Sequence, residues 1–590
     1  MSNPSVEEGI EVGVSNGFEE RKAVLLALGG SEVYGAAALV SLASGGDAAE
    51  ANVALRRVAE WFDHPHPQGR GLQEEPDFAA IKLCRAWHRF GSDGGLEADT
   101  LERIRRFFLF HDFASIYKGG ENHVLLFRSA RHLMAAVFPK ETFAAYRKTG
   151  AVLREEDGAW LKRFLRYRAG HGWGEFDSSC YLAVVWECLT CLFDFSPDGE
   201  LRRLAGMMMD LLLADFEVDA LRGMYGGAHG RIYERQALDH AADTTIWLHY
   251  LYFGGEPPAP IQMDNFMIDA LASSYRPHPT VAGLALNRER PYENRERKHL
   301  HNVADVLPEE PLAGSIRKYT FWTPDYVMGC VQFQDPYPGP HYPHHDGLPV
   351  PVAHWLPADF EHIQQHQWDL SFATRTDARL FTHHPGTDHT HNHWTGDRLC
   401  GCGHFFQNRS ALIALYDIPP GQPYQWIHAY VPRMAYDEIV EENGLLFVRA
   451  GTGYGALRLL AGYRWTREGE WKDREIIAEG PRHAVVCEAG READFGSFAA
   501  FRDEIAANAV RFDIEGMELQ YSSRRSGLLR INRPGRRYFD GASVDLDYPA
   551  YDSPWLRAPW GASRVEVDAG GEQPPLTLDF SETAQQPRGD

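Results

Sequence analysis

The sequence predicts a multidomain α and β protein, with an N-terminal α/α toroid (an incomplete barrel of helical hairpins) followed by an antiparallel β-sandwich or supersandwich. Residues 17–255 carry apolar side chains every three or four positions, which is the period of helices. After about residue 315, short runs with period two and many aromatic or β-branched residues indicate strands. About ten successive helices without a strict sequence repeat favour a toroid over a regular repeat array.

The helical part contains segments whose apolar residues share one face. These segments are residues 18–45, 50–62, 76–90, 98–112, 121–138, 157–169, 178–194, 199–216 and 238–252. Glycine-rich clusters such as residues 91–95 and 223–227 separate several of them, as expected for turns. The pattern changes after the Gly- and Pro-rich residues 253–260, where a short helical stretch and a charged linker follow.

Short strands then dominate, with one helix near residues 496–508. The clearest strand segments are residues 317–322, 326–331, 370–374, 410–416, 444–450 and 484–488. Many short strands joined by polar turns predict a sandwich. The predicted boundaries are a disordered N-terminus at 1–16, the toroid at 17–275, a linker at 276–314, the β-domain at 315–575 and a disordered tail at 576–590.

The composition narrows the classes of function. The chain has 590 residues, of which 44% are apolar, and a net charge of −23. The apolar content is that of a globular protein and argues against extensive disorder. The acidic balance argues against nucleic-acid binding, which needs basic patches. An anionic partner would therefore need Arg and His side chains concentrated locally at its site.

The N-terminus and the apolar runs bear on location. Residues 1–18 are polar and acidic, without the basic and apolar regions of a signal peptide. No apolar run reaches the roughly 18–20 residues of a membrane helix. The sequence thus predicts a cytoplasmic protein without membrane association, or a periplasmic or secreted one if a leader was removed. A homodimer is compatible with the sequence.

The first candidate motif opens the helix at residues 121–138. Glu121, Asn122 and His123 follow two glycines, and Arg128 lies two turns later. A helix N-terminus offers free N–H groups and a positive dipole end, so an amide beside an imidazole there could bind a carboxylate and move a proton. Asn122 and His123 are therefore candidate catalytic residues, and Glu121 and Arg128 are candidate substrate-binding residues. A capping Asn with a packed His would give the same pattern.

The second candidate motif is a glycine-rich aromatic loop at residues 170–181. Glu175, Asp177 and Tyr181 are candidates for acid–base work, with Tyr181 as the catalytic residue. Trp173 could stack on a sugar ring. A capped helix whose tyrosine belongs to the core is the structural alternative.

The third candidate motif lies at residues 226–233, where small residues surround His229, Arg231 and Tyr233. The guanidinium of Arg231 is a fixed fork of donors that suits a carboxylate. We expect all three to bind substrate, although a solvated arginine in a loop would look the same.

The fourth motif is a concentration of histidines in the predicted β-domain. These histidines are His362, His366, His383, His384, His389, His391, His393 and His404. Trp368 and Trp394 lie among them. The cluster indicates either a structural divalent metal, zinc or calcium, or a sugar-binding cleft with a catalytic histidine. His404, just before a predicted strand, is the best single catalytic candidate of the group.

These motifs in this order resemble the heparinase II/III-like and alginate-lyase group of polysaccharide lyases. In that group an Asn-His pair lies on one toroid helix, a Tyr follows some fifty to sixty positions later, and the β-domain contributes a His or Tyr. Here Tyr181 follows His123 by 58 positions, and His404 comes from the predicted sandwich. The resemblance covers about residues 70–510.

The resemblance implies β-elimination at a uronic acid of an anionic oligosaccharide or polysaccharide, with an unsaturated uronate as product and no cofactor required for the chemistry. Asn122, with His229 or Arg231, would hold the uronate carboxylate and stabilise the enolate-like intermediate. The C5 proton would go to His123 or Tyr181.

The roles of Tyr181 and His404 stay open between alternatives. Tyr181 would also protonate the leaving oxygen, and His404 would act as base or as carboxylate neutraliser from the opposite wall. A tyrosine base requires a pKa lowered by nearby cations. The lack of a recognisable leader favours trimming of imported oligosaccharides.

Two other functions fit the same residues. A glycoside hydrolase on a toroid would need two carboxylates beside the scissile bond. The carboxylates available for it are Glu175, Asp177, Asp239 and Asp243. A non-catalytic glycan-binding protein would use aromatic platforms such as Trp173, Trp368 and Trp394.

Overall fold

The computed structural model describes most of the chain, and residues 6–16, 299 and 315 by their backbone alone. The described residues are 6–30, 33–60, 75–114, 120–257, 266–299, 315–332, 366–385, 393–394, 403–418, 420–422, 424–533, 535–570 and 574–582.

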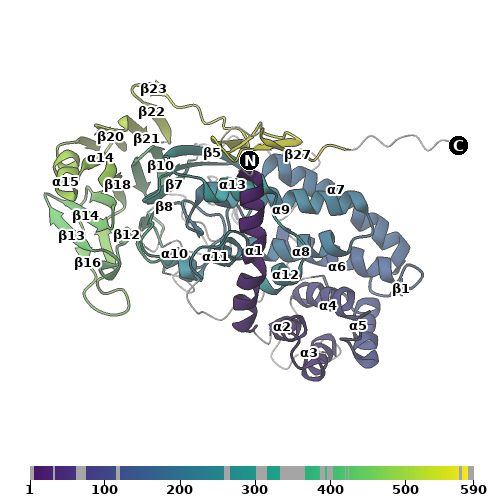
Figure 1. Cartoon of the computed structure of the whole chain (residues 1–590). Helices are drawn as coiled ribbons and strands as arrows, with labels where there is room; N and C mark the ends of the chain where they lie inside the picture. Colours follow the sequence, from purple (N-terminus) through teal and green to yellow (C-terminus); the bar gives the residue numbers. More distant parts are fainter. Residues whose placement is uncertain are drawn as a thin grey trace.

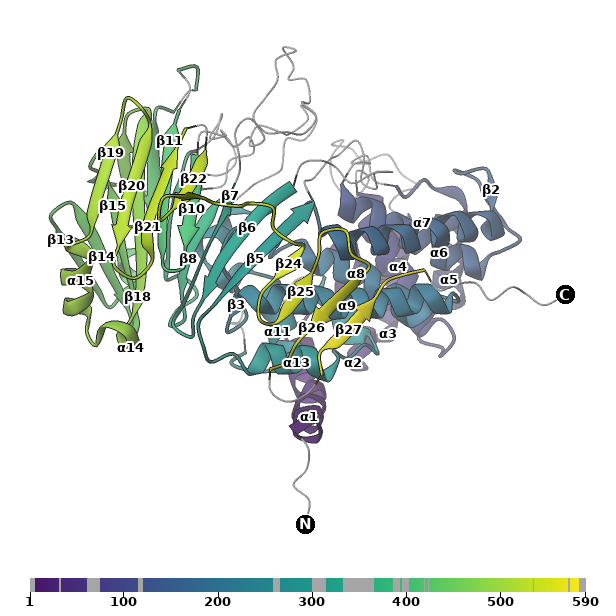
Figure 2. The same ribbon diagram turned by 90° about the horizontal axis from the view of Figure 1, so that it is seen from above.

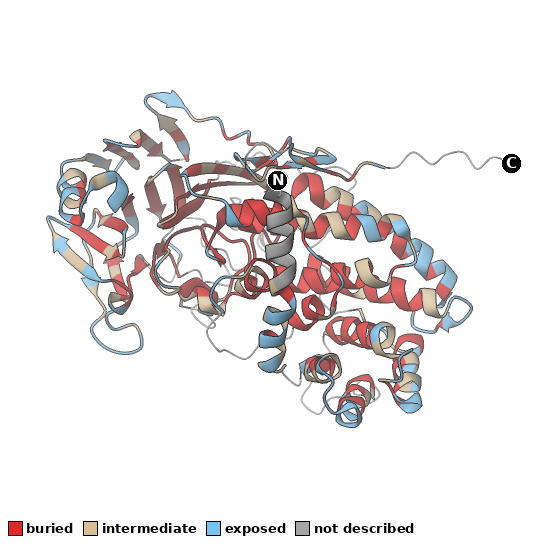
Figure 3. Cartoon of the chain, viewed as in Figure 1, coloured by how far each residue is buried: buried red, intermediate tan, exposed pale blue. Residues whose placement is uncertain are grey.

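Helices fill the first half of the described chain. They are α1 (Val6–Ala27), α2 (Ala36–Ser44), α3 (Ala48–Glu60), α4 (Pro76–Phe90), α5 (Ala98–Phe110), α6 (Glu121–Val137), α7 (Gly150–His171), α8 (Leu182–Phe195), α9 (Gly199–Asp219), α10 (Glu234–Leu238), α11 (Thr245–Phe253), α12 (Met267–Ala272) and α13 (Pro279–Leu286). Sequential helices pack as antiparallel hairpins, such as α6 with α7 and α8 with α9. Burial covers nearly every side of α8 but only one face of α5, so α8 lies inside the helical body (Figure 3).

A sheet of twelve antiparallel strands crosses the middle of the molecule (Figure 1). In spatial order its strands are β16 (Arg464–Trp465), β17 (Glu475–Glu479), β12 (Trp426–Tyr430), β9 (Arg379–His383), β8 (Trp368–Phe372), β7 (Tyr326–Gln332), β6 (Ser315–Trp322), β5 (Tyr292–His299), β24 (Tyr551–Asp552), β25 (Leu556–Ala558), β26 (Arg564–Val567) and β27 (Leu576–Asp579).

Two further sheets stack behind the first. The six-stranded sheet runs β10 (Gly403–Asn408), β11 (Ala411–Asp417), β18 (Arg482–Arg491), β15 (Gly453–Leu459), β14 (Leu445–Ala450) and β13 (Glu438–Glu442). The five-stranded sheet runs β19 (Ala509–Asp513), β20 (Glu518–Ser523), β21 (Gly527–Asn532), β22 (Arg536–Phe539) and β23 (Ala542–Ser543). Helices α14 (Glu492–Phe495) and α15 (Phe498–Ala506) lie against the six-stranded sheet.

Alternating side chains give the three layers separate cores. On β10, Phe405 packs between the twelve- and six-stranded sheets, whereas its neighbour Phe406 packs against the five-stranded sheet. Because side chains of a strand alternate between faces, one strand serves both cores. Two short hairpins complete the described elements: β1 (Thr142–Phe143) with β2 (Lys148–Thr149), and β3 (Ala220–Leu221) with β4 (Met224–Tyr225).

The structure confirms the predicted fold class, helical hairpins followed by antiparallel β-layers. It differs from the predicted boundaries at three places. The predicted linker contains β5, a central strand of the large sheet, and the predicted disordered tail contains β27. Helix α1 begins at Val6, inside the predicted disordered N-terminus. Strands β24–β27 extend the sheet over α7 and α9 (Figure 2), so the C-terminal end of the chain holds the two parts together.

None of the helices described is long and apolar enough to cross a membrane.

Candidate active site

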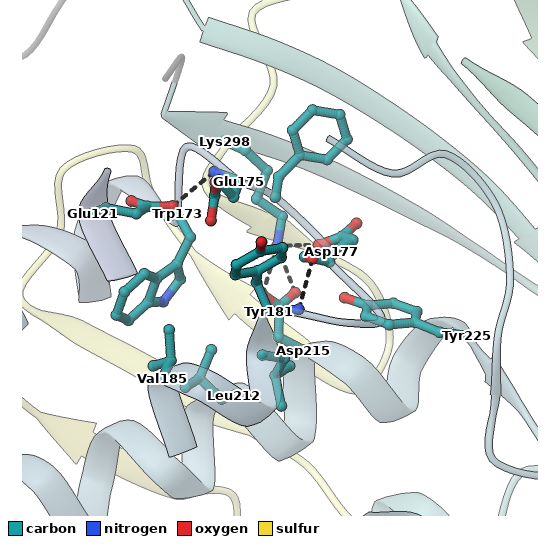
Figure 4. Close-up of a pocket in the computed structure, with 13 residues that line it drawn as sticks. Glu121, Trp173, Glu175, Asp177, Tyr181, Val185, Leu212, Asp215, Tyr225 and Lys298 are labelled. Carbon is teal, nitrogen blue, oxygen red and sulfur yellow. Dashed lines mark hydrogen bonds and ion pairs between the residues drawn. The ribbon is translucent and has the colours of Figure 1, made fainter. Parts of the chain in front are cut away.

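A narrow cavity lies where the loop after α7 meets the large sheet (Figure 4). Its lining residues are Glu121, Trp173, Glu175, Phe176, Asp177, Ser178, Tyr181, Leu182, Val185, Leu212, Asp215, Tyr225 and Lys298. The cavity volume available to water centres is about 30 Å³. That is room for one or two waters. A carboxylate or hydroxyl of a ligand therefore fits here, whereas a whole sugar ring does not.

Two loops bonded to each other build the wall of this cavity. Helix α7 ends where Gly172 adopts a φ of 68°, a conformation that glycine tolerates. Gly230 donates its N–H to the Phe176 carbonyl at 2.7 Å, and Ser178 Oγ donates to the Arg231 carbonyl at 2.8 Å. These bonds bring the predicted motifs at 170–181 and 226–233 together.

Tyr181, which lines the cavity, forms one hydrogen-bonded group with Tyr233 and Arg231. The two tyrosine hydroxyls are 2.7 Å apart, and Nη2 of Arg231 donates to Tyr233 at 3.1 Å and to Tyr181 at 3.3 Å. Nε and Nη1 of Arg231 are buried and have no hydrogen-bond partner among the described residues. Unmade hydrogen bonds at a buried cation are costly, so these two donors are free to bind an anionic group.

The same group fixes the protonation state of Tyr181. Burial raises the pKa of Tyr181 well above its usual value, although the Arg231 charge opposes that shift. The pKa lowering required of a tyrosine base is therefore not found. Tyr181 is held as a neutral phenol, which can donate a proton.

Glu175 lies beside this group and titrates near neutrality. Asn122 Nδ2 donates to Glu175 Oε2 at 3.2 Å. Burial is the main cause that raises the pKa of Glu175 to about 7; Glu121 adds to the shift and Arg231 opposes it. A carboxyl group with this pKa exchanges protons readily at neutral pH.

Glu121 holds the loop that carries Glu175. Its carboxylate accepts the N–H groups of Gly174 at 3.1 Å and Glu175 at 2.7 Å, and it pairs with Arg168 at 2.9 Å. Trp173 lines the cavity but is almost fully buried, with its ring packed edge-on against Phe164 at 5.5 Å between centroids. Both residues support the loop in the described structure, and Trp173 has no exposed ring face for sugar stacking.

A buried ion network lies beneath the cavity. The ammonium group of Lys318 contacts the carboxylates of Asp177, Asp219 and Glu296, and that of Lys298 contacts Asp215 at 2.5 Å. Three carboxylates around one point resemble a cation site, and here the Lys318 ammonium provides the cation.

This network anchors the loop after α7 to the sheet. Burial alone would raise the pKa of Asp177, but Lys298 and Lys318 lower it to about 2. Asp177 also adopts a φ of 49°, a conformation that is unfavourable for residues with a side chain. Its ion pairs therefore stabilise a strained turn between Glu175 and Tyr181.

His123 and Arg128 bind partners outside the cavity. His123 Nδ1 bonds to Asp77 at 2.7 Å, which overcomes burial and raises the His123 pKa, and its ring does not line the cavity. Arg128 pairs with Asp157 at 2.8 Å and stacks on Trp160, so the proposed substrate contact is replaced by a structural one. Of this motif, Glu121 lines the cavity, and Asn122 reaches the site through its bond to Glu175.

His229 lies at the junction with the sheet. Its Nδ1 bonds to the Asp177 carbonyl at 2.6 Å, and its backbone pairs with that of His366. Burial first, and then the neighbours His366 and Arg379, lower the His229 pKa to about 3. His229 is therefore neutral, and its buried Nε2 has no partner among the described residues.

His404 is not part of the cavity, which corrects the expectation that it acts from the opposite wall. It alternates with Phe405, whose side chain enters the core beside the large sheet, so His404 faces the five-stranded sheet. Burial lowers its pKa to about 3, with Arg537 and Arg533 as the nearest charges. The sequence placed His404 just before the predicted strand at 410–416, whereas it lies within a separate strand, β10, and the sequence did not reveal which face it occupies.

The tryptophans expected to bind sugar in the β-domain belong to the core. Trp368 is fully buried and donates its Nε1–H to Thr382 at 2.9 Å. Trp394 is also fully buried and stacks on His428 at 3.9 Å between ring centroids. Of the histidine cluster, His362, His389 and His391 lie outside the described residues.

Sequence reasoning missed the lysines. Lys298 and Lys318 lie on β5 and β6, where adjacent charged residues suggest exposure to solvent. Both side chains are buried because they neutralise carboxylates from the toroid. The sequence did offer one signal: each lysine stands in a strand whose other residues include apolar ones typical of a core.

No family model matches the chain, and no curated protein matches it. Among solved structures, the chain is similar to the Streptomyces coelicolor A3 chondroitin AC lyase in complex with chondroitin sulphate. The two are 12% identical over 96% of this chain and 88% of that chain, with a TM-score of 0.43.

Proposed function

We propose that this protein is a lyase that cleaves uronic-acid-containing oligosaccharides or polysaccharides by β-elimination. The observation that carries the proposal is the buried guanidinium of Arg231, which has two unpaired donors beside two tyrosine hydroxyls. A planar fork of donors matches a carboxylate. The adjoining cavity accepts a group of that size but not a whole sugar ring.

The proposed chemistry begins with the uronate carboxylate. The proton on C5 becomes acidic only when the charge of the neighbouring carboxylate is neutralised, because removal of the proton creates an enolate. Arg231 binds the carboxylate and stabilises the negative charge that develops on its oxygens. The amide of Asn122 holds Glu175 in place beside it.

Glu175 and Tyr181 then divide the proton transfers. Glu175, with a pKa of about 7, accepts the C5 proton in its ionised form. Tyr181, kept neutral by burial, donates its proton to the leaving O4. After the product leaves, Glu175 releases the C5 proton to water, and Tyr181 regains a proton from water through its bond to Tyr233. No cofactor takes part in these steps.

The hydrolase alternative has less support. Asp177 is committed to Lys318, and Asp243 bonds to His240 at 2.7 Å. Asp239 caps the turn at Ala241. None of these three is left to act with Glu175 as the second carboxylate that a glycosidase requires.

Product absorbance tests the proposal. Alginate, heparan, chondroitin, hyaluronan, pectic and ulvan-type oligomers would each be incubated with the protein. A lyase produces a conjugated unsaturated uronate that absorbs in the ultraviolet, and a hydrolase does not. We expect absorbance to rise with at least one of these substrates and to stay flat with the Arg231→Met variant. Cleavage without absorbance would refute the proposal.

A further inference from the structure

A second pocket, larger than the cavity, lies toward the other end of the strands of the large sheet. We call it the hairpin pocket, and its walls are mainly the β3–β4 hairpin, α11, α13, residues 254–257 and the turns after β6 and β8. Lys298 near the end of β5 lines the cavity, whereas Trp322, the register partner of Tyr292 at the start of β5, lines this pocket. These positions are about 20 Å apart along the strand. The volume available to water centres is about 670 Å³ here, within the range of about 300–1,000 Å³ that is typical of ligand pockets.

Most of the wall of the hairpin pocket is apolar, with charged groups at a few points. Met224, Ile246 and Leu286 are among the apolar side chains. The charged lining residues are Arg222, Glu256, Arg288 and Arg375. Three arginines against one carboxylate form a local positive excess in a chain whose net charge is −23. An apolar wall with a few placed cations suits a small organic anion.

Arg288 is a buried cation of this wall with one hydrogen bond left unmade. Its side chain is 4% exposed, and its Nη2 pairs with Glu217 at 3.2 Å. Nη1 donates to the Glu217 carbonyl and to the Tyr292 hydroxyl, and the guanidinium lies 5.0 Å from the centre of the Trp322 ring. Nε is buried and has no partner among the described residues. An unmade bond at a buried cation is costly, and an oxyanion in the pocket would accept it.

Arg222 extends from the turn of the β3–β4 hairpin. It forms this two-residue turn with Gly223, and φ is 56° at Arg222 and 83° at Gly223. Such turns favour Asn, Asp or Gly over arginine at the first position. Arg222 is exposed and donates from Nη1 to the Ala373 carbonyl at 3.5 Å, but no carboxylate among the described residues pairs with it. Arg375, by contrast, is paired with Asp377 at 2.8 Å. The guanidinium of Arg222 is therefore available to an anion, at a position where the backbone alone favours another residue.

We propose that the hairpin pocket binds a small organic acid with an apolar body. Its carboxylate pairs with Arg222 and accepts the Nε–H of Arg288, and its apolar part lies against Met224 and Leu286. This site is independent of the proposed lyase chemistry. Strand β4 nevertheless touches both sites, because Met224 lines the pocket and Tyr225 lines the cavity. A ligand bound to Arg222 would therefore hold the strand that carries Tyr225.

Displacement of a fluorescent anion from the whole protein tests this proposal without any activity assay. Anilinonaphthalene sulfonate, which fluoresces in apolar surroundings, would be titrated into the purified chain and then displaced with octanoate, octanol or acetate. We expect octanoate to displace one molecule of the probe per chain. Octanol lacks the charge and acetate lacks the apolar body, so each should bind at least about tenfold more weakly. Equal displacement by octanol, or stronger displacement by a uronic acid disaccharide than by octanoate, would overturn the proposal.

Two variants locate the site. Arg222→Asn removes the guanidinium and places in the turn a residue that its backbone favours. The dissociation constant for octanoate should therefore rise about tenfold, while the midpoint of urea unfolding stays the same or increases. Arg288→Lys keeps a charge beside Glu217 but removes Nε and the fork of donors, so it should weaken octanoate binding by a similar factor.

Arg147→Asn is the matched control for Arg222→Asn. Arg147 is also exposed and has a φ of 52°, but it lies just before β2 and does not line the hairpin pocket. The same charge is removed from the same kind of backbone, so octanoate binding should not change. Unchanged octanoate binding in Arg222→Asn, or an equal loss in Arg147→Asn, would overturn the proposal.

Discussion

The Tyr181→Phe variant probes the proposed acid directly. The change deletes one hydroxyl and leaves the ring, the loop and the neighbouring cavity in place. Without it, no group of the described site can protonate the leaving oxygen at the position of Tyr181. Loss of a general acid lowers rates by about 10²–10⁴, which is about 3–5 kcal/mol of transition-state stabilisation.

The effect of this variant on stability should be much smaller than its effect on the rate. The Tyr181 hydroxyl bonds to Tyr233 and Arg231, and each such bond contributes about 0.5–1.5 kcal/mol. Tyr233 keeps its bond from Arg231 after the change. We therefore expect a loss of about 1–2 kcal/mol, measured by urea denaturation.

Tyr252→Phe is the matched control. The Tyr252 hydroxyl is also buried in the toroid and accepts a bond from Trp186 at 3.3 Å, but it does not line the cavity. This control should lose similar stability and retain full activity. Initial rates would be followed by product absorbance on the best substrate of the screen. A Tyr181→Phe variant that keeps more than about a tenth of the wild-type rate would refute the assignment of Tyr181 as the acid.

Three more variants test the other parts of the site. Arg231→Lys keeps the charge but loses the fork of donors, so kcat/KM should fall about 10²–10³-fold in steady-state assays; a change below threefold would contradict its role. Because Glu175 must be ionised to act as base, kcat/KM should rise with pH through about 7, whereas a fall through that range would mean that the protonated form is active. Because the Glu175 pKa is raised from 4.5 to about 7 in the folded chain, the fold gains stability from the neutral carboxyl group, and this gain is complete below pH 4.5. The gain is lost as pH rises from 4.5 through 7, so the unfolding free energy relative to Glu175→Gln should decrease over that range. Lys318→Met leaves the buried Asp219 without a cation, and Asp177 and Glu296 with Lys298 alone. It should cost about 3–5 kcal/mol in urea denaturation, against under about 1 kcal/mol for Arg464→Met at an exposed pair.

The sequence predicted the fold class and much of the cavity. Helical and alternating periods located most elements because each period reports which face is buried. The motifs around Tyr181 and Arg231 were predicted as separate loops, and hydrogen bonds between those loops unite them. The glycines in both segments were the useful signal, because the two loops can lie against each other only where their backbones approach closely.

The sequence could not assign residues whose role depends on distant partners. Arg128 and His123 have the types and spacing of site residues, but Asp157 and Asp77 hold them elsewhere. His404 is one residue away from a core position, and strand alternation places it on the wrong face. The Lys318 network joins three segments far apart in the chain, and no local pattern reveals such pairing.

The mass balance of cleavage tests β-elimination most directly. A defined uronic acid oligomer would be digested, and the masses of both fragments would be measured by mass spectrometry. The account predicts that the fragment masses sum to the mass of the intact oligomer, because elimination adds nothing to the glycan. Fragments that together exceed that mass by one water molecule would contradict it.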